Sequence, residues 1–211
     1  MLQIRTRIMS CPSDSAPHLN TPRSVWVDIP DVAEKDIKFI VNATNNYVGV
    51  NSVHASTCYV HQRRPGLVTI PEGNNGFFSA LNEHRKHKDL LDGHSNILAF
   101  GERAWEYRTR GQTYNAYAAN TYTGRFAKQI VTVNGQGDGD ACGTLNNGEA
   151  INFPHAEPLK AMDTFSSRHP GGALFSMADG SVHFLSDTTD PNTLVRLGHI
   201  SDGEFVGDFQ N

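Results

Sequence analysis

The sequence predicts an α+β domain made of an antiparallel β-sheet, one or two short helices and long loops rich in Gly and Asn. Three observations lead to this prediction. A β-hairpin pattern surrounds Asp179-Gly180, several other short segments alternate as strands do, and helical periodicity is confined to brief stretches. The chain has 211 residues, of which 38% are hydrophobic, so we expect residues 1–211 to form a single domain around one core.

The hairpin is the strongest local signal. Runs of strand-forming residues at 173–178 and 181–186 flank Asp179-Gly180, a dipeptide typical of two-residue turns. A two-residue turn fixes the register, and with it the side of the hairpin on which each side chain lies. In the predicted register the core-facing side carries four large apolar residues, with Met177 opposite Val182 and Phe175 opposite Phe184.

The segments before the hairpin are less regular. Four prolines within residues 12–30 predict an irregular N-terminal segment. Alternation between Asp36 and Val53 predicts two strands, separated by a turn-prone stretch at 42–46. Apolar residues at both ends of Phe77–Leu91 predict a helix with a charged middle.

The later elements are short. Ile97–Phe100 has the pattern of a buried strand, and Ile130–Val133 that of another. Gly135–Gly148 is a glycine-rich loop. Asp190-Pro191 predicts the start of a helix whose apolar side carries Leu194, Val195 and Leu197 and which ends at Gly198.

Composition limits the classes of function. A formal net charge of -4 gives no electrostatic footprint for nucleic acid, and no apolar run reaches the roughly 18 residues of a membrane span. No signal-peptide pattern follows Met1, which on its own favours the cytosol, whereas 19% charged residues in a loop-rich chain are more typical of an extracellular β protein. Cys11, Cys58 and Cys142 are too scattered for a structural zinc framework and leave open one disulfide or three free thiols.

Several segments match a family pattern. His169, nine intervening residues and Asp179-Gly180 form the pattern H-x9-DG, within Ser167-Arg168-His169-Pro170-Gly171-Gly172 and Asp179-Gly180-Ser181-Val182. Cys11-Pro12-Ser13-Asp14, Asn46-Tyr47-Val48-Gly49 and a segment from Asp92-Gly93-His94-Ser95-Asn96 to Gly101-Glu102 follow the same order, with His94 where Thr is usual. Together they cover most of the chain, which resembles the bacterial prepilin-type processing-associated H-x9-DG domain family.

The resemblance implies a pseudopilin-like protein, with a cleavable leader, a long apolar N-terminal helix and a globular head built on an antiparallel sheet. The N-terminal pilin helix is absent from this sequence, so we expect a head fragment or a helix-less relative. The family pattern implies a location in the cell envelope or outside the cell. It also implies contacts with other pilin-like subunits or envelope proteins, and no established catalysis.

The signature His169 and Asp179 invite interpretation as a catalytic dyad. If residues 173–178 form a straight strand, the two lie roughly 20 Å apart, at about 3.3 Å per residue. We therefore expect Asp179 to form a turn by accepting backbone N–H bonds, and His169 to pack or hydrogen-bond beside a separate turn. The sequence thus predicts no catalytic residue.

Calcium is the cofactor that we expect if there is one, because the pseudopilins that this chain resembles use calcium in their loops. Candidate oxygen ligands are Asp138 and Asp140, while Asp92, Asn96 and Glu102 of the family pattern offer others. No stretch forms a complete calcium loop, and ordinary turn chemistry is the alternative. A transition-metal cluster of His84, His87 and His94 is disfavoured by neighbouring Arg85, Lys86 and Lys88.

Aromatic residues after position 104 give the last candidate site. Trp105, Tyr107, Tyr114 and Tyr117 have the side chains of a stacking platform for sugar rings, and the alternative is that they fill a core. The leading hypothesis is a non-enzymatic, pseudopilin-like head that acts through protein contacts. The alternatives are an extracellular carbohydrate-binding module and a metal-assisted hydrolase that uses His residues.

Overall fold

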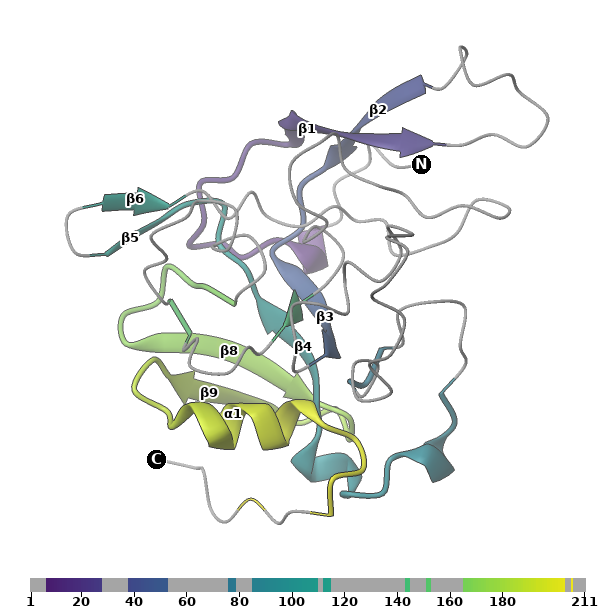
Figure 1. Cartoon of the computed structure of the whole chain (residues 1–211). Helices are drawn as coiled ribbons and strands as arrows, with labels where there is room; N and C mark the ends of the chain where they lie inside the picture. Colours follow the sequence, from purple (N-terminus) through teal and green to yellow (C-terminus); the bar gives the residue numbers. More distant parts are fainter. Residues whose placement is uncertain are drawn as a thin grey trace, which may run out of the picture.

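A five-stranded sheet forms the centre of the molecule (Figure 1). The computed structural model describes residues 7–27, 38–52, 76–78, 85–109, 112–114, 143–144, 151–152, 165–203 and 206. The strands lie in the order β7 (Gly143–Thr144), β3 (Tyr47–Ser52), β4 (Leu98–Glu102), β8 (Gly172–Met177) and β9 (Val182–Ser186). β3, β4, β8 and β9 are antiparallel neighbours, and the two-residue β7 runs parallel to β3. The predicted antiparallel sheet is confirmed.

One α-helix, α1 (Pro191–Gly198), lies against this sheet among the described residues (Figure 1). Pro191 takes the first helical position, and the Asp190 carboxylate accepts the N–H of Thr193 at 3.1 Å, as an N-cap does. The amphipathic pattern directs Leu194 and Leu197 inward, where both are buried. The predicted helix is confirmed.

The core lies between α1 and one face of the sheet. Among the described residues, its main cluster contains twelve buried apolar residues from the strands, α1 and neighbouring segments: Val48, Val50, Leu98, Ile151, Phe165, Ala173, Phe175, Met177, Leu185, Leu194, Leu197 and Val206. Phe165 and Phe175 pack with ring centroids 5.0 Å apart, over Gly101 of β4, where a side chain would collide with both rings. A glycine in the middle of β4 is thus required by the packing.

The predicted register of the β8–β9 hairpin is wrong by one residue. Ser176 pairs with Val182 and Phe175 with His183, and the loop has three residues. Met177 donates its N–H to Ser181 O at 2.8 Å and accepts from Gly180 N, while Gly180 has φ +88°. This is a type I turn followed by a left-handed glycine, the usual geometry of a three-residue hairpin loop.

The changed register moves β9 side chains to the opposite face. Phe175 and Met177 are buried as predicted, but Val182 is 64% exposed and Phe184 47% exposed, so their assignment to the core is wrong. Because side chains alternate along a strand, a one-residue slip exchanges the two faces of β9. Leu185 of β9 fills the core instead.

The helix predicted over Phe77–Leu91 is wrong where the structure describes it. Residues 87–89 form one 3-10 turn, η4 (His87–Asp89), and residues 79–84 lie outside the described part. The Asp89 carboxylate accepts the N–H of Lys86 at 2.7 Å, and the following N–H of Leu91 bonds Ile200 O. The charged run offers no apolar side to bury, so these local and long-range bonds replace helix continuation. Two further 3-10 turns are η1 (Arg7–Met9) and η5 (His94–Asn96).

Two smaller ribbons complete the described structure. β1 (Leu19–Val27) pairs with β2 (Lys38–Ala43), and β5 (Tyr107–Thr109) pairs with β6 (Gln112–Tyr114). The expectation of an irregular N-terminal segment is therefore wrong for β1, whose register is interrupted between Leu19 and Ser24, around Pro22. The strands predicted between 36 and 53 are confirmed as β2 and β3, while Ile130–Val133 lies outside the described residues. No helix within the described ranges has the length and hydropathy to cross a membrane.

Candidate functional site

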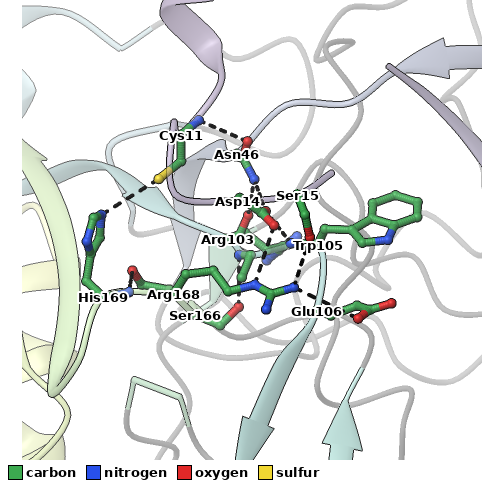
Figure 2. Close-up of polar contacts among 12 residues, drawn as sticks. Cys11, Asp14, Ser15, Asn46, Arg103, Trp105, Glu106, Ser166, Arg168 and His169 are labelled. Atoms are coloured by element: carbon green, nitrogen blue, oxygen red, sulfur yellow. Dashed lines mark hydrogen bonds and ion pairs between the residues drawn. The ribbon is translucent and has the colours of Figure 1, made fainter. Parts of the chain in front are cut away.

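Four segments that are far apart in the sequence meet where β4 ends and β8 begins (Figure 2). They are residues 11–14 of the N-terminal segment, Asn46 before β3, residues 102–105 at the end of β4, and residues 166–169 before β8. Three of the four belong to stretches that carry the family resemblance, and the fourth includes its Glu102. The structure thus brings much of the family pattern to one end of the sheet.

Asp14 is the hydrogen-bonding centre of this end. Its carboxylate, with the side chain 1% exposed, accepts the backbone N–H of Trp105 at 2.6 Å and a side-chain N–H of Asn46 on the same oxygen, Oδ2. Arg168 Nε lies 3.6 Å from the other oxygen, Oδ1. A buried carboxylate is tolerated only with such partners, so Asp14 fixes the segment after Cys11 to the sheet.

Asn46 and Ser166 extend this network. Asn46 Oδ1 accepts the N–H of Cys11 at 3.0 Å, and Asn46 Nδ2 also donates to Arg103 O at 3.1 Å. Ala104 donates its N–H to Ser166 O at 2.9 Å, and Ser166 donates its own to Glu102 O at 3.0 Å. Where β4 ends, its backbone groups therefore form hydrogen bonds with side chains and with irregular backbone in place of a neighbouring strand.

Cys11, Glu102 and His169 form a compact cluster beside this network. Cys11 Sγ lies 3.7 Å from His169 Nε2, and Glu102 Oε1 lies 3.4 Å from the same nitrogen. All three ligand-type atoms are within 4.8 Å of one another. Cys11 and Glu102 are buried, and the His169 side chain is 31% exposed, so the cluster reaches solvent on the histidine side.

Burial raises the pKa of the Cys11 thiol, and the negative charges of Glu102 and Asp14 raise it further, against a lowering by a backbone hydrogen bond at Ser13. Burial likewise raises the pKa of Tyr47, with added contributions from Glu102 and Cys11. The cluster therefore disfavours a free thiolate at neutral pH, in contrast to the activated cysteine of a thiol enzyme. Cys11 is a free cysteine in the described part of the structure.

The rest of the family pattern lies at the opposite end of β4 and β8. The Asp92 carboxylate accepts the N–H groups of Asp202 at 2.8 Å and Gly203 at 2.9 Å, and Asn96 donates to Asp92 O at 3.0 Å. Gly93 has φ +89° and precedes η5, which includes the exposed Ser95. These contacts hold the chain that leads into β4, as turn chemistry does.

Asp179 lies at this second end. Its Oδ1 accepts the N–H of Ser181 at 2.8 Å and its hydroxyl at 2.7 Å, while the N–H of Asp179 bonds His94 O. These hydrogen bonds lower the pKa of Asp179. His169 precedes β8 and Asp179 follows it, so the strand separates the two signature residues and they do not form a dyad.

The other proposed ligands have mixed outcomes. Asp138 and Asp140 lie outside the described residues, so a calcium site there stays a prediction. Asp92, His199 and Asp202 gather at the surface, but the two Asp92 oxygens already accept backbone N–H groups. His87 Nδ1 lies 3.0 Å from His94 Nε2, and His84 is outside the described part.

The predicted glycan platform is only partly described. Trp105 is half-buried and is held by its backbone bond to Asp14. Tyr107 and Tyr114 are direct partners in the β5–β6 ribbon, and Tyr117 lies outside the described residues. Glycan binding by these residues stays a prediction.

The contact between Cys11 and His169 could not be predicted from the sequence. The two residues are 158 positions apart, so no local spacing could have joined them. A weak signal existed, because Cys11, Glu102 and His169 each belong to a separate segment of the family pattern. When no single segment of a family pattern forms a complete site, the segments can be expected to contact one another in the fold.

Comparisons with known proteins give a family and no individual relative. A search of curated proteins and a search of solved structures each found no match. The sequence model of one family matches residues 4–192, which is most of the chain. The chain therefore belongs to the family described as "Protein of unknown function (DUF1559)".

Proposed function

We propose that this chain is the non-enzymatic globular head of a pseudopilin-like protein of the bacterial envelope, and that it acts through protein contacts in a pilus or type II secretion-like assembly. The observation that carries the proposal is a band of exposed apolar side chains on the sheet face opposite the core. It comprises Phe78, Phe100, Val182 and Phe184, and we call it the apolar band.

The strand register places the band on one face. Phe100 of β4 is opposite Ser176 of β8, which is opposite Val182 of β9. Phe100 is also opposite Gly49 of β3, and the Phe78 ring occupies the space above Gly49, with its centroid 4.9 Å from that of Phe100. The band therefore crosses the sheet from β3 to β9.

Exposure of these residues favours a protein contact. The exposed fractions are 36% for Phe78, 38% for Phe100, 64% for Val182 and 47% for Phe184. Exposed apolar side chains gathered on one face of a sheet are typical of interaction sites, because their burial by a partner is favourable in free energy. We propose a pilin-like subunit with an apolar surface as the partner.

The hydrogen bonds of the family pattern support a structural role. Asp14, Asp92 and Asp179 each accept two hydrogen bonds, at least one of them from a backbone N–H. Carboxylates committed in this way stabilise turns and strand ends and leave little capacity for acid–base chemistry. The residues that typify the resemblance thus work as a frame for the sheet.

Site-specific photo-crosslinking in cells of the source organism tests the proposal. A benzophenone amino acid at Phe184 should form adducts with a pilin-like subunit, which mass spectrometry of the crosslinked band identifies. The same group at Thr188, which is exposed beyond β9, is the matched control and should form few adducts. Equal adducts at both positions, or none at Phe184, would count against the apolar band as the contact.

Cell fractionation tests the location separately. An antibody against the chain should detect the protein in the envelope or the medium, together with envelope markers. Recovery in the cytosolic fraction alone would refute a pilin-like head, whatever the crosslinking result.

A further inference from the structure

The second inference concerns the cluster of Cys11, Glu102 and His169, and it does not depend on the proposed function. Three chemically different ligand atoms, a thiol sulfur, a carboxylate oxygen and an imidazole nitrogen, converge from three segments of the chain. Nothing in the packing of a simple core requires this combination at one point. The distances between the atoms give the first reason to regard it as a binding site.

Two of the three separations match those of ligands around one tetrahedral ion. Bond lengths of about 2.3 Å to sulfur and about 2.0–2.1 Å to nitrogen and oxygen put sulfur and nitrogen about 3.6 Å apart, and nitrogen and oxygen about 3.3 Å apart. The observed separations are 3.7 Å for Cys11 Sγ and His169 Nε2, and 3.4 Å for His169 Nε2 and Glu102 Oε1. The third separation, between Cys11 Sγ and Glu102 Oε1, is no more than 4.8 Å.

A buried, unsatisfied carboxylate oxygen gives the second reason. The Glu102 side chain is 3% exposed, and its Oε2 accepts the N–H of Leu174 at 2.8 Å. Its Oε1 is also buried and makes no hydrogen bond of ordinary geometry with any residue in the described ranges. A buried carboxylate oxygen that has only the neighbouring His169 and Cys11 side chains beside it, and no well-formed hydrogen bond, is costly, and a bound cation would remove that cost.

The contacts of the imidazole differ from those of a relay of the catalytic-triad type. In a triad the nucleophile and the acid lie at different ring nitrogens, so that the histidine takes a proton at one while the acid orients it through the other. Here the thiol and the carboxylate both lie at Nε2 of His169. A thiol, a carboxylate and an imidazole nitrogen that face one point are arranged as ligands of a metal ion are.

We propose that Cys11 Sγ, Glu102 Oε1 and His169 Nε2 bind one divalent transition-metal ion of the Zn²⁺ type. Thiolate with imidazole selects such an ion over Ca²⁺ and Mg²⁺, which prefer oxygen ligands only. On binding, the thiol proton of Cys11 is released to solvent and the sulfur coordinates as thiolate. Three protein ligands leave one position open, and the partly exposed His169 marks the solvent side on which it lies.

The surrounding bonds orient two of the three ligands. The N–H of Leu174 holds Glu102 through the oxygen that does not face the cluster, and the N–H of Cys11 is held by Asn46 Oδ1 at 3.0 Å. Support of this kind from a second layer of residues is characteristic of metal sites, because it fixes the ligands before the ion arrives. The site is accordingly formed largely in advance.

Cobalt spectroscopy on the whole chain tests the proposal. After reduction and chelation, titration with Co²⁺ should give a thiolate-to-cobalt charge-transfer band and intense visible bands of a tetrahedral ion, saturating at one equivalent. Zn²⁺ should displace the cobalt, and a large excess of Ca²⁺ should not. The absence of a charge-transfer band in the folded wild-type chain would overturn the proposal, as would displacement by Ca²⁺.

Variants locate the ion. Cys11→Ser should abolish the charge-transfer band, and His169→Gln and Glu102→Gln should each weaken Co²⁺ binding at least tenfold. The double variant His87→Gln/His94→Gln removes another histidine pair and should bind as the wild type does. A charge-transfer band that persists in Cys11→Ser, or full loss of binding in the His87/His94 control, would place the ion elsewhere and refute the assignment.

Thermal melting keeps the test independent of variants that fail to fold. One equivalent of Zn²⁺ should raise the Tm of the wild-type chain, because an ion that binds only the folded state stabilises it. The Tm of Cys11→Ser should not respond to Zn²⁺. If the wild-type Tm is unchanged by Zn²⁺, the site does not bind the ion in solution and the proposal fails.

Discussion

Removing the carboxylate of Asp14 should strongly destabilise the chain, because this one group joins the N-terminal segment to both sides of the sheet end. In Asp14→Ala the N–H of Trp105 and one N–H of Asn46 lose their common acceptor. Each buried donor left unsatisfied costs about 1–3 kcal/mol. Loss of the contact with Arg168, whose side chain is 33% exposed, adds at most about 1 kcal/mol. We expect a total loss of about 4 kcal/mol.

Equilibrium unfolding in urea, followed by circular dichroism, measures this loss. Asp14→Asn keeps the shape and one oxygen that can accept both N–H groups, so it should cost less, about 1–2 kcal/mol. Asp187→Ala is the matched control, since the Asp187 carboxylate has no side-chain partner in the described part of the structure, and it should change stability by less than about 0.5 kcal/mol. If Asp14→Ala stays within about 1 kcal/mol of the wild type at an unchanged m-value, Asp14 does not hold this end of the sheet.

Three further predictions follow from the strand ends and the apolar band. Gly172→Ala should cost about 3 kcal/mol or more in urea unfolding, because its side chain would collide with the backbone carbonyl of Leu185, whereas Gly171→Ala meets no atom and should cost only about 1 kcal/mol for its φ of +81°. The folded-state pKa of Asp179 is lowered, so its stabilising contribution is present above the unfolded pKa and is lost as pH falls through the folded value. Asp179→Asn should therefore make the free energy of unfolding depend less on pH between pH 5 and pH 2. An unchanged slope of this free energy against pH would refute the prediction. Phe184→Ser should leave the urea midpoint nearly unchanged but reduce binding of a hydrophobic dye, and a large loss of stability would show that the band belongs to the core.

Elements defined by nearby residues could be predicted from the sequence. The helix after Asp190 is set by a capping carboxylate, a proline at its first position and apolar spacing, all within eight residues. β4 was likewise predicted as a short apolar run bounded by turn residues. In these cases local preference and burial favour the same structure, so tertiary contacts do not override it.

The failures arise where a small local difference has a large consequence. Asp179-Gly180 signals a hairpin, but it does not distinguish a two-residue loop from a three-residue loop in which Ala178 also belongs to the turn. That single residue decides whether Phe184 is in the core or in solvent. The choice is made by contacts beyond the hairpin, since Ala178 donates its N–H to Ile97 O and Asp179 donates to His94 O. Such contacts leave no trace in the local sequence.

The cluster of Cys11, Glu102 and His169 also depends on contacts between distant segments, which the local sequence does not reveal. Cys11 belongs to the N-terminal segment, Glu102 to the end of β4, and His169 to the approach to β8, so a bound ion would crosslink three separate parts of the chain. A metal bond at this point opposes separation of the N-terminal segment from the sheet. The proposed ion would therefore stabilise the folded chain at this junction, even if it took no part in any reaction.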